Sequence, residues 1–278
     1  MQLKTDHRTV RLVQGDREQS VWRKDQPDYL VHSYVQLCAL AMLTWVGYAP
    51  KRKGRALIIG LGGGILCRFL RRHFPNVEIE ACEPDAKVIA IAREHFALDA
   101  KVMVHCADGR AHMSGRTGKY DIVLLDAFDS TYVPASLMTY EFLQLVKQRL
   151  SPGGIFVSNT WVLPEITAHE DATYISVFGS AWDIRRRPNI DGNRILLING
   201  AAVGSADALY DLLAARTAEL DIRTKFHATP RKPGERRMLS YSEIAERLAI
   251  RPVVTPEEGR IMNDMNIKRI RAQSSFDV

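Results

Sequence analysis

The stretch Ala56-Leu-Ile-Ile-Gly-Leu-Gly-Gly-Gly-Ile-Leu66 decides the fold of this 278-residue chain. Its apolar first half is typical of a buried β-strand, and helical spacing follows the glycines. Glycines at such a turn tolerate positive φ and let a ligand approach the backbone closely. Glu83-Pro-Asp85 follows the next predicted strand, where an acidic side chain can bind both hydroxyls of a ribose. Together the two motifs predict a nucleotide-binding βα unit.

Strands and helices alternate through the centre of the chain. This alternation predicts an α/β, Rossmann-like fold with a mostly parallel, seven-stranded sheet covered by helices on both faces. We expect strands at 56–60, 77–82, 101–105, 121–125, 154–159, 182–185 and 193–198, and helices at 65–74, 85–96 and 135–150.

The chain divides into three predicted regions. Residues 1–50 form a small N-terminal hairpin and a helix, the hairpin turning at Gln14-Gly-Asp16. Residues 51–204 form the nucleoside-binding Rossmann-like catalytic domain. Residues 205–278 form a basic, helical C-terminal extension, with helices expected at 205–219 and 240–249.

Composition narrows the classes of partner. The formal net charge is +6, but the basic residues are scattered rather than gathered in one stripe, so nucleic acid is an unlikely partner. No apolar run is long enough to span a membrane, and the N-terminus lacks a signal-like core, so we expect a cytoplasmic protein. The four cysteines lack C-x-x-C or Cys/His ligand spacing, which predicts buried, reduced thiols and no metal.

Acidic residues follow three predicted strands in succession: Glu83 follows the second strand, Asp108 the third, and Asp126 and Asp129 the fourth. Because ligands of open α/β sheets bind beyond the carboxyl ends of the strands, these acids are candidate site residues. The third glycine of a dinucleotide motif is missing, since Cys67 stands there, so a mononucleoside fits better. Glu83 would bind the ribose and Asp108 the adenine amino group, which indicates an S-adenosyl ligand and the S-adenosylmethionine-dependent methyltransferase type of fold. The predicted nucleoside-binding residues are Gly60, Gly62, Gly63, Gly64, Glu83, Asp108 and Gly109.

The chain resembles the polyamine aminopropyltransferases, or spermidine synthases, over about residues 10–200. The resemblance lies in the glycine stretch 57–68, in Glu83, in Ala107-Asp-Gly109 and in Tyr120-Asp-Ile-Val-Leu-Leu-Asp-Ala-Phe-Asp129. It continues through Leu150-Ser-Pro-Gly-Gly154.

This resemblance implies transfer of an aminopropyl group from decarboxylated S-adenosylmethionine to a diamine or polyamine by a homodimeric enzyme. It implies that Asp126 orients the attacking amine and takes its proton, that Asp129 lies on the amine side, and that Tyr34 aligns the nitrogen. Gln19 matches a glutamine of the family and Trp161 can border the acceptor pocket, so both are predicted to bind substrate, as are Tyr34 and Asp129.

One departure leaves two alternatives open. Gly63 stands where the family usually has an aspartate that contacts the aminopropyl amine. Without that carboxylate, the donor can instead be intact S-adenosylmethionine, which predicts a methyltransferase acting on an amine or another small molecule. A catalytically idle nucleoside-binding protein is the third reading, against which the presence of Asp126, Asp129 and Tyr34 argues.

Overall fold

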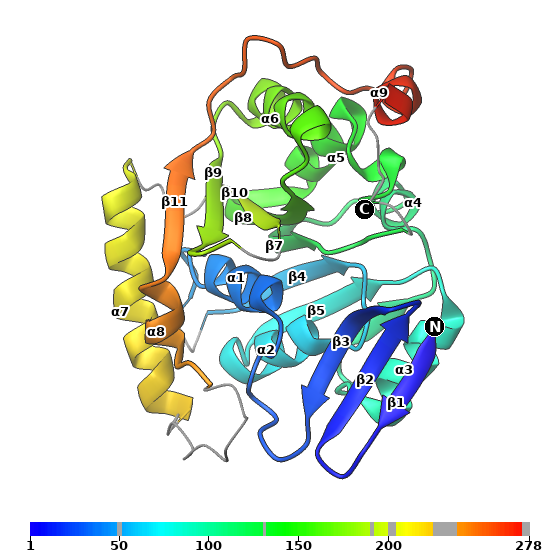
Figure 1. The fold of residues 1–278 in the computed structure, drawn as a ribbon, viewed down its shortest axis with the longest axis vertical. Coiled ribbons are helices and arrows are strands. Elements are labelled where there is room, and N and C mark those ends of the chain that lie inside the picture. Colours follow the sequence, from blue (N-terminus) through cyan, green and yellow to red (C-terminus); the bar gives the residue numbers. More distant parts are fainter. Residues whose placement is uncertain (49–51, 130–131, 190–191, 200–203, 225–237, 274–278) are drawn as a thin grey trace.

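Two sheets form the framework of the protein (Figure 1). The structure is a computed structural model that describes residues 1–48, 52–129, 132–189, 192–199, 204–224 and 238–273. In spatial order, the large sheet contains β11 (Leu248–Pro252), β9 (Trp182–Arg186), β10 (Asn193–Ile198), β8 (Leu150–Trp161), β7 (Tyr120–Leu125), β4 (Gly54–Ile59), β5 (Val77–Cys82) and β6 (Met103–His105). The run from β8 to β6 is parallel, and β10, β9 and β11 add to it antiparallel.

The predicted α/β fold is confirmed, but the sheet has eight strands among the described residues instead of seven. The extra strand is β11, which lies in the extension predicted to be helical. Its Leu248 and Ile250 are buried in alternation, and Pro252 disfavours helical backbone at the residue before it. The predicted helix at 240–249 therefore shortens to α8 (Tyr241–Ala245), and the chain continues as an edge strand.

Helices cover both faces of the large sheet. Besides α8, the helices of the described residues are α1 (Ser33–Met42), α2 (Ile65–His73), α3 (Ala86–His95), α4 (Gly109–Ser114), the short 3₁₀ turn η1 (Ala135–Leu137), α5 (Tyr140–Arg149), α6 (Pro164–Phe178), α7 (Ala206–Thr224) and α9 (Ile267–Gln273). Two of them, α4 and α6, were not predicted from the sequence.

The alternation of side chains along β4 builds two cores. Ala56 and Ile58 pack on the face covered by α1, α2, α7 and α8, whereas Leu57 and Ile59 pack on the face covered by α4, α5, α6 and α9. Successive residues of a strand point to opposite faces, so a strand buried on both faces must be apolar throughout. Figure 1 shows α7 running beside β11 and α1 lying across the sheet.

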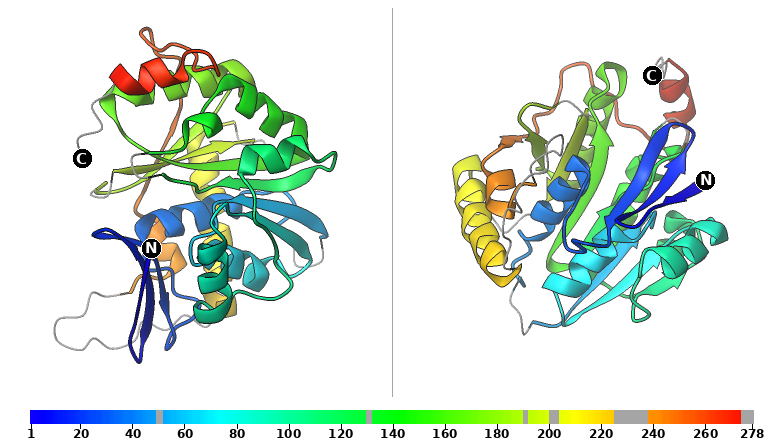
Figure 2. Two further views of the ribbon diagram at one scale, coloured as in Figure 1. Left: turned by 90° about the vertical axis from the view of Figure 1, so that its right-hand side faces the viewer. Right: turned by 60° about the horizontal axis from the view of Figure 1, so that its bottom comes forward.

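The N-terminal residues form a three-stranded antiparallel sheet rather than a two-stranded hairpin. Its strands are β1 (Gln2–Thr5), β2 (Thr9–Gln14) and β3 (Arg17–Arg23), and Gly15 at the β2–β3 turn has a φ of 58°. Val10 and Leu12 pack on Val88 and Phe96 of the α3 region. Figure 2 shows that this small sheet is separate from the large sheet and lies beside it. Among the described residues, no helix combines the length and apolar character needed to cross a membrane.

Candidate active site

The site forms where the strand order reverses. The chain passes from β4 outward to β5 and β6, then returns to the other side of β4 as β7. The carboxyl ends of β4 and β7 therefore lie side by side, and the backbone N–H of Asp126 donates to the Ile59 carbonyl at 2.8 Å. Gly60 has a φ of 92°, and a Cβ there would lie 2.2 Å from the Asp126 carbonyl oxygen. Glycine is thus required to bring the nucleoside loop against the predicted base.

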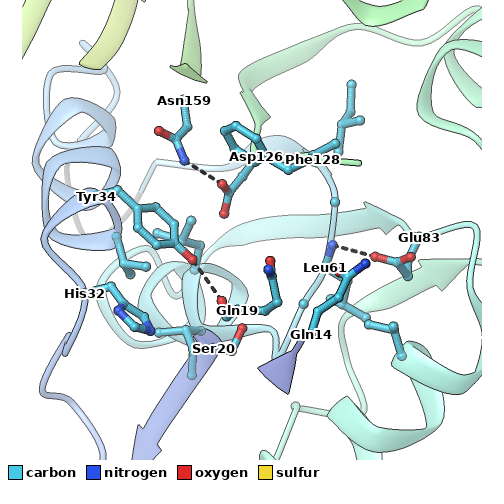
Figure 3. A pocket seen from close by; sticks show the side chains of 18 of the residues that line it. Gln14, Gln19, Ser20, His32, Tyr34, Leu61, Glu83, Asp126, Phe128 and Asn159 are labelled. Atoms are coloured by element: carbon cyan, nitrogen blue, oxygen red, sulfur yellow. Dashed lines mark hydrogen bonds between the residues drawn. The ribbon is translucent and has the colours of Figure 1, made fainter. Parts of the chain in front are cut away.

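A pocket of about 990 Å³ opens at this edge of the sheet (Figure 3). It brings together residues from the small N-terminal sheet, from α1 and from the ends of β4, β5, β7 and β8. The predicted site residues that line it are Gln19, Tyr34, Gly60, Gly62, Glu83, Asp108, Gly109, Asp126, Asp129 and Trp161. Gly63 and Gly64 do not line it, although both were predicted to contact the nucleoside.

Gly63 faces the N-terminal sheet instead of the pocket. Its N–H donates to Ser20 Oγ at 2.9 Å. A Cβ at this position would lie 2.6 Å from the Phe96 ring and 2.9 Å from Ser20 Cβ. The space that a larger side chain would need is therefore occupied by β3 and by the end of α3.

The acids of the nucleoside side are held by backbone amides. Glu83 accepts hydrogen bonds from the N–H groups of Leu61 at 3.2 Å and Asp85 at 3.1 Å, which ties the end of β5 to the glycine turn. Asp108 caps α4 by accepting from Ala111 N at 3.0 Å, so it has a structural role beside its place in the pocket lining. Next in the helix, Arg110 forms a bidentate ion pair with Asp264, at 2.6 and 2.7 Å.

Asp126 lies half-buried at the end of the central strand β7. Nδ2 of Asn159 donates to Asp126 Oδ1 at 2.9 Å, and Asn193 Nδ2 donates to Asn159 Oδ1 at 3.1 Å. Burial raises the pKa of Asp126 to about 6, while the hydrogen bond from Asn159 opposes this increase. A carboxylate with a pKa near neutrality is suited to accept a proton in catalysis.

Tyr34 approaches the same carboxylate from α1. Its hydroxyl donates to the Gln19 backbone carbonyl at 3.0 Å, and its ring stacks on His32 with centroids 5.6 Å apart. Burial and the nearby charge of Asp126 raise the pKa of Tyr34 well above its usual value, so the phenol stays neutral. Figure 3 shows Tyr34 and Asp126 in the same pocket, with the Tyr34 hydroxyl directed at Gln19 and the Asp126 carboxylate at Asn159.

Asp129 and Trp161 form the outer end of the pocket. Asp129 Oδ1 accepts from Tyr132 N at 2.9 Å, and its Oδ2 lies 3.5 Å from a guanidinium nitrogen of Arg271 in α9. Trp161 stacks on Phe128 at 5.1 Å, and the Arg17 guanidinium lies 5.4 Å from the Trp161 ring centre. The C-terminal helix therefore reaches the predicted acceptor side, which the sequence did not indicate.

Several residues of the site were not predicted. Asn159 is the most informative, because it lies near the carboxyl end of β8 beside Asp126 and so follows the same strand-end rule that identified the acids. Its neighbours in the pocket lining, Phe128 and His32, carried no comparable signal. One cysteine also departs from prediction: Cys106 is exposed, whereas Cys38, Cys67 and Cys82 are buried free thiols.

Comparisons with known proteins agree with this geometry. Residues 39–180 match the family described as spermine/spermidine synthase domain. A polyamine aminopropyltransferase of Vibrio vulnificus is 35% identical over 212 residues, which cover 74% of this chain and 69% of the relative. An eEF1A lysine and N-terminal methyltransferase of Xenopus laevis is 30% identical over 158 residues, which cover 52% of this chain and 23% of that protein.

Solved structures show the same fold. The crystal structure of a probable spermidine synthase from Corynebacterium glutamicum superposes with a TM-score of 0.69 and 19% identity, covering 83% of this chain and 95% of that one. Human methyltransferase-like protein 13 in complex with SAH gives a TM-score of 0.61 and 22% identity, covering 73% of this chain and 97% of that one. The methyltransferase-type fold predicted from the glycine turn is confirmed. By its matched domain and its relatives, the chain belongs to the spermine/spermidine synthase family.

Proposed function

We propose that this protein transfers an aminopropyl group from decarboxylated S-adenosylmethionine to a diamine or polyamine. The observation that carries the proposal is Asp126, a half-buried carboxylate with its pKa raised to about 6 at the meeting point of the glycine turn and Tyr34. The glycine turn, Glu83 and Asp108 would hold the nucleoside of the donor. Tyr34, Asp129 and Trp161, with Gln19, would surround the acceptor.

The charge of the pocket supports cationic substrates. The donor is a sulfonium, and an alkyl amine resembles lysine, with a pKa of about 10.4, so two positive species must meet. Acidic side chains outnumber basic ones in the lining, where Asp16, Glu18, Glu83, Asp108, Asp126 and Asp129 stand against Arg17 and Arg186. Such an excess of carboxylates offsets the repulsion between the two substrates.

Asp126 would act on the attacking amine. The amine nitrogen forms a bond to the aminopropyl methylene carbon that is attached to sulfur. The bond between this carbon and sulfur breaks, and its electron pair stays on the sulfur of the neutral thioether. The proton lost by the amine passes to Asp126. Asn159 holds this carboxylate in place, and general-base assistance of this kind is worth roughly 10²–10⁴-fold in rate.

Assays with each donor test the proposal. Purified protein is incubated with radiolabelled decarboxylated or intact S-adenosylmethionine and a panel of diamines and polyamines. We expect product from the decarboxylated donor. Product from the intact donor alone would instead make the protein a methyltransferase, and tight nucleoside binding without turnover would make it an idle binding protein.

A single substitution tests the role of Asp126. Asp126→Asn should abolish turnover and leave nucleoside affinity nearly unchanged, because the amide keeps the shape but cannot take the proton. Asp85→Asn is the matched control, since Asp85 caps α3 and does not line the pocket. Activity that survives Asp126→Asn would refute the assignment. We also expect a cytoplasmic homodimer, which light scattering on the purified protein and cell fractionation would check.

A further inference from the structure

Three potential metal ligands converge outside the substrate pocket. They are Glu80 on β5, His105 at the end of β6 and His112 on α4, and their ligand atoms all lie within 4.8 Å of one another. Nε2 of His105 lies 3.3 Å from Glu80 Oε2, and Nε2 of His112 lies 3.5 Å from the same oxygen. The two imidazole rings have centroids 4.3 Å apart.

The two imidazole nitrogens are unsatisfied. Both Nε2 atoms are buried, and neither has a hydrogen-bond partner among the residues that the structure describes. His112 is 8% exposed as a residue and Glu80 is 4% exposed. Buried polar atoms in native proteins are normally hydrogen-bonded, so two such atoms aimed at one carboxylate oxygen indicate a missing partner at their centre.

The separations match those of ligands around zinc. With Zn–N and Zn–O distances of about 2.0–2.2 Å and tetrahedral angles, two ligand atoms are roughly 3.3 Å apart. The two histidine–glutamate separations of 3.3 and 3.5 Å agree with this value. Two histidines and one glutamate are also a donor set that binds zinc and leaves a position open for water.

The surroundings hold the carboxylate in the required orientation. The Arg55 guanidinium binds the other oxygen, Glu80 Oε1, at 2.6 Å, and Tyr120 OH donates to Oε2 at 3.3 Å. Hydrogen bonds of this kind to a ligating carboxylate fix its position in metal sites. The His105 side chain is 22% exposed, which gives an ion a route to the cluster from solvent.

We propose that Glu80, His105 and His112 bind a divalent transition-metal ion, with Zn²⁺ as the probe ion. The ion joins β5, β6 and α4 through Glu80 Oε2 and the two Nε2 atoms. The helix α4 begins directly after its capping residue Asp108, which lines the substrate pocket. The ion therefore stabilises the segment that carries this predicted nucleoside-binding residue. Cysteine and histidine spacing along the chain does not reveal this site, because its ligands come from three separate elements.

Calorimetric titration tests the site directly. The untagged full-length chain, stripped with a chelator and dialysed, is titrated with ZnCl₂, and its thermal unfolding is followed with and without zinc. We expect one zinc per chain and a rise in unfolding temperature on binding. His105→Ala and His112→Ala should each weaken binding by about 100-fold or more, since even outer-shell changes cost about 10–100-fold. His95→Ala, on the exposed end of α3, should bind as the parent does.

Two results would overturn the proposal. One is a parent chain that binds no zinc. The other is a folded His105→Ala/His112→Ala double variant that retains the parent stoichiometry and affinity. If these variants do not fold, X-ray absorption at the zinc edge of the loaded parent protein decides: two imidazole ligands per zinc support the site, and none refutes it.

Discussion

Asn159 lies near the carboxyl end of β8, Asp126 directly follows the adjacent strand β7, and the Asn159 side-chain amide donates a 2.9 Å hydrogen bond to the Asp126 carboxylate. Asn159 is itself oriented by Asn193 on β10, because Asn193 Nδ2 donates to Asn159 Oδ1. The antiparallel part of the sheet thus positions a residue at the switch point of the parallel part. The hydrogen bond that opposes the rise in the pKa of Asp126 therefore depends on the relative positions of β7, β8 and β10.

The acid limb of the pH–rate profile should report this hydrogen bond. With the pKa of Asp126 raised to about 6, kcat/KM should fall as pH decreases through this value, because the base becomes protonated. Asn159→Leu removes the donor that stabilises the carboxylate, so the limb should move to higher pH. Asn76→Ala, on the exposed turn before β5, should leave the profile unchanged. An unshifted limb in folded Asn159→Leu would show that another group titrates.

Asp126→Asn should stabilise the protein above pH 6. The pKa of Asp126 is raised in the folded state, so the folded chain holds its proton longer than the unfolded chain and loses stability as pH rises from about 4 to 6. Each pKa unit is worth about 1.4 kcal/mol and water in the pocket screens the charge, so the gain at pH 8 is on the order of 2 kcal/mol. Thermal unfolding at pH 4 and pH 8 measures it. Equal gains at both pH values would contradict the mechanism.

Gly63→Asp should reduce stability through a clash with Phe96. A Cβ at position 63 would lie 2.6 Å from the buried Phe96 ring, and overpacking of this kind costs about 1–3 kcal/mol. Phe96→Ala frees the space, so the double variant should lose less stability than the sum of the single losses. Gly204→Asp is the control, since a Cβ there meets no atom of the described residues within 4 Å. Additive losses, measured by urea unfolding, would exclude the clash.

Arg194→Ala should be strongly destabilising. Arg194 on β10 is fully buried and lies 3.1 Å from Glu170 and 2.7 Å from Asp171. Its removal leaves buried carboxylates without a counter-charge, which costs about 3–5 kcal/mol. Arg251 also pairs with Asp183, but the Arg251 side chain is 62% exposed. Arg251→Ala should therefore cost less than about 1 kcal/mol of stability. Comparable losses in the two variants would show that burial does not decide the cost.

Features set by neighbouring residues were predictable from the sequence. The glycine turn, the strands of the central sheet and the acids at their ends depend on local periodicity and on the strand-end rule, and the structure places Glu83, Asp108 and Asp126 around one pocket. The family resemblance added Tyr34, which α1 brings to the same pocket.

Features that depend on distant contacts were not predictable. The alternation of Leu248 and Ile250 permits a strand, but that strand also needs the edge of β9 to pair with, and the local sequence does not reveal this edge. The orientation of Gly63 depends on β3 and on Phe96, and the charge of Asp129 is offset by Arg271 from α9. Asn159 lies near the carboxyl end of its strand, but an uncharged amide there does not stand out in the sequence as the acids do.

The two ion pairs made by the C-terminal segment have a consequence for biosynthesis. Asp264 pairs with Arg110 across 154 residues of sequence, and Arg271 pairs with Asp129 across 142. Domains fold as the chain emerges from the ribosome, N-terminal parts first. The glycine turn and its acids can therefore assemble during translation. The ion pairs of Arg110 and Asp129 form only after Asp264 and Arg271 have been made. A nascent chain thus acquires its finished site only after Arg271 has been made.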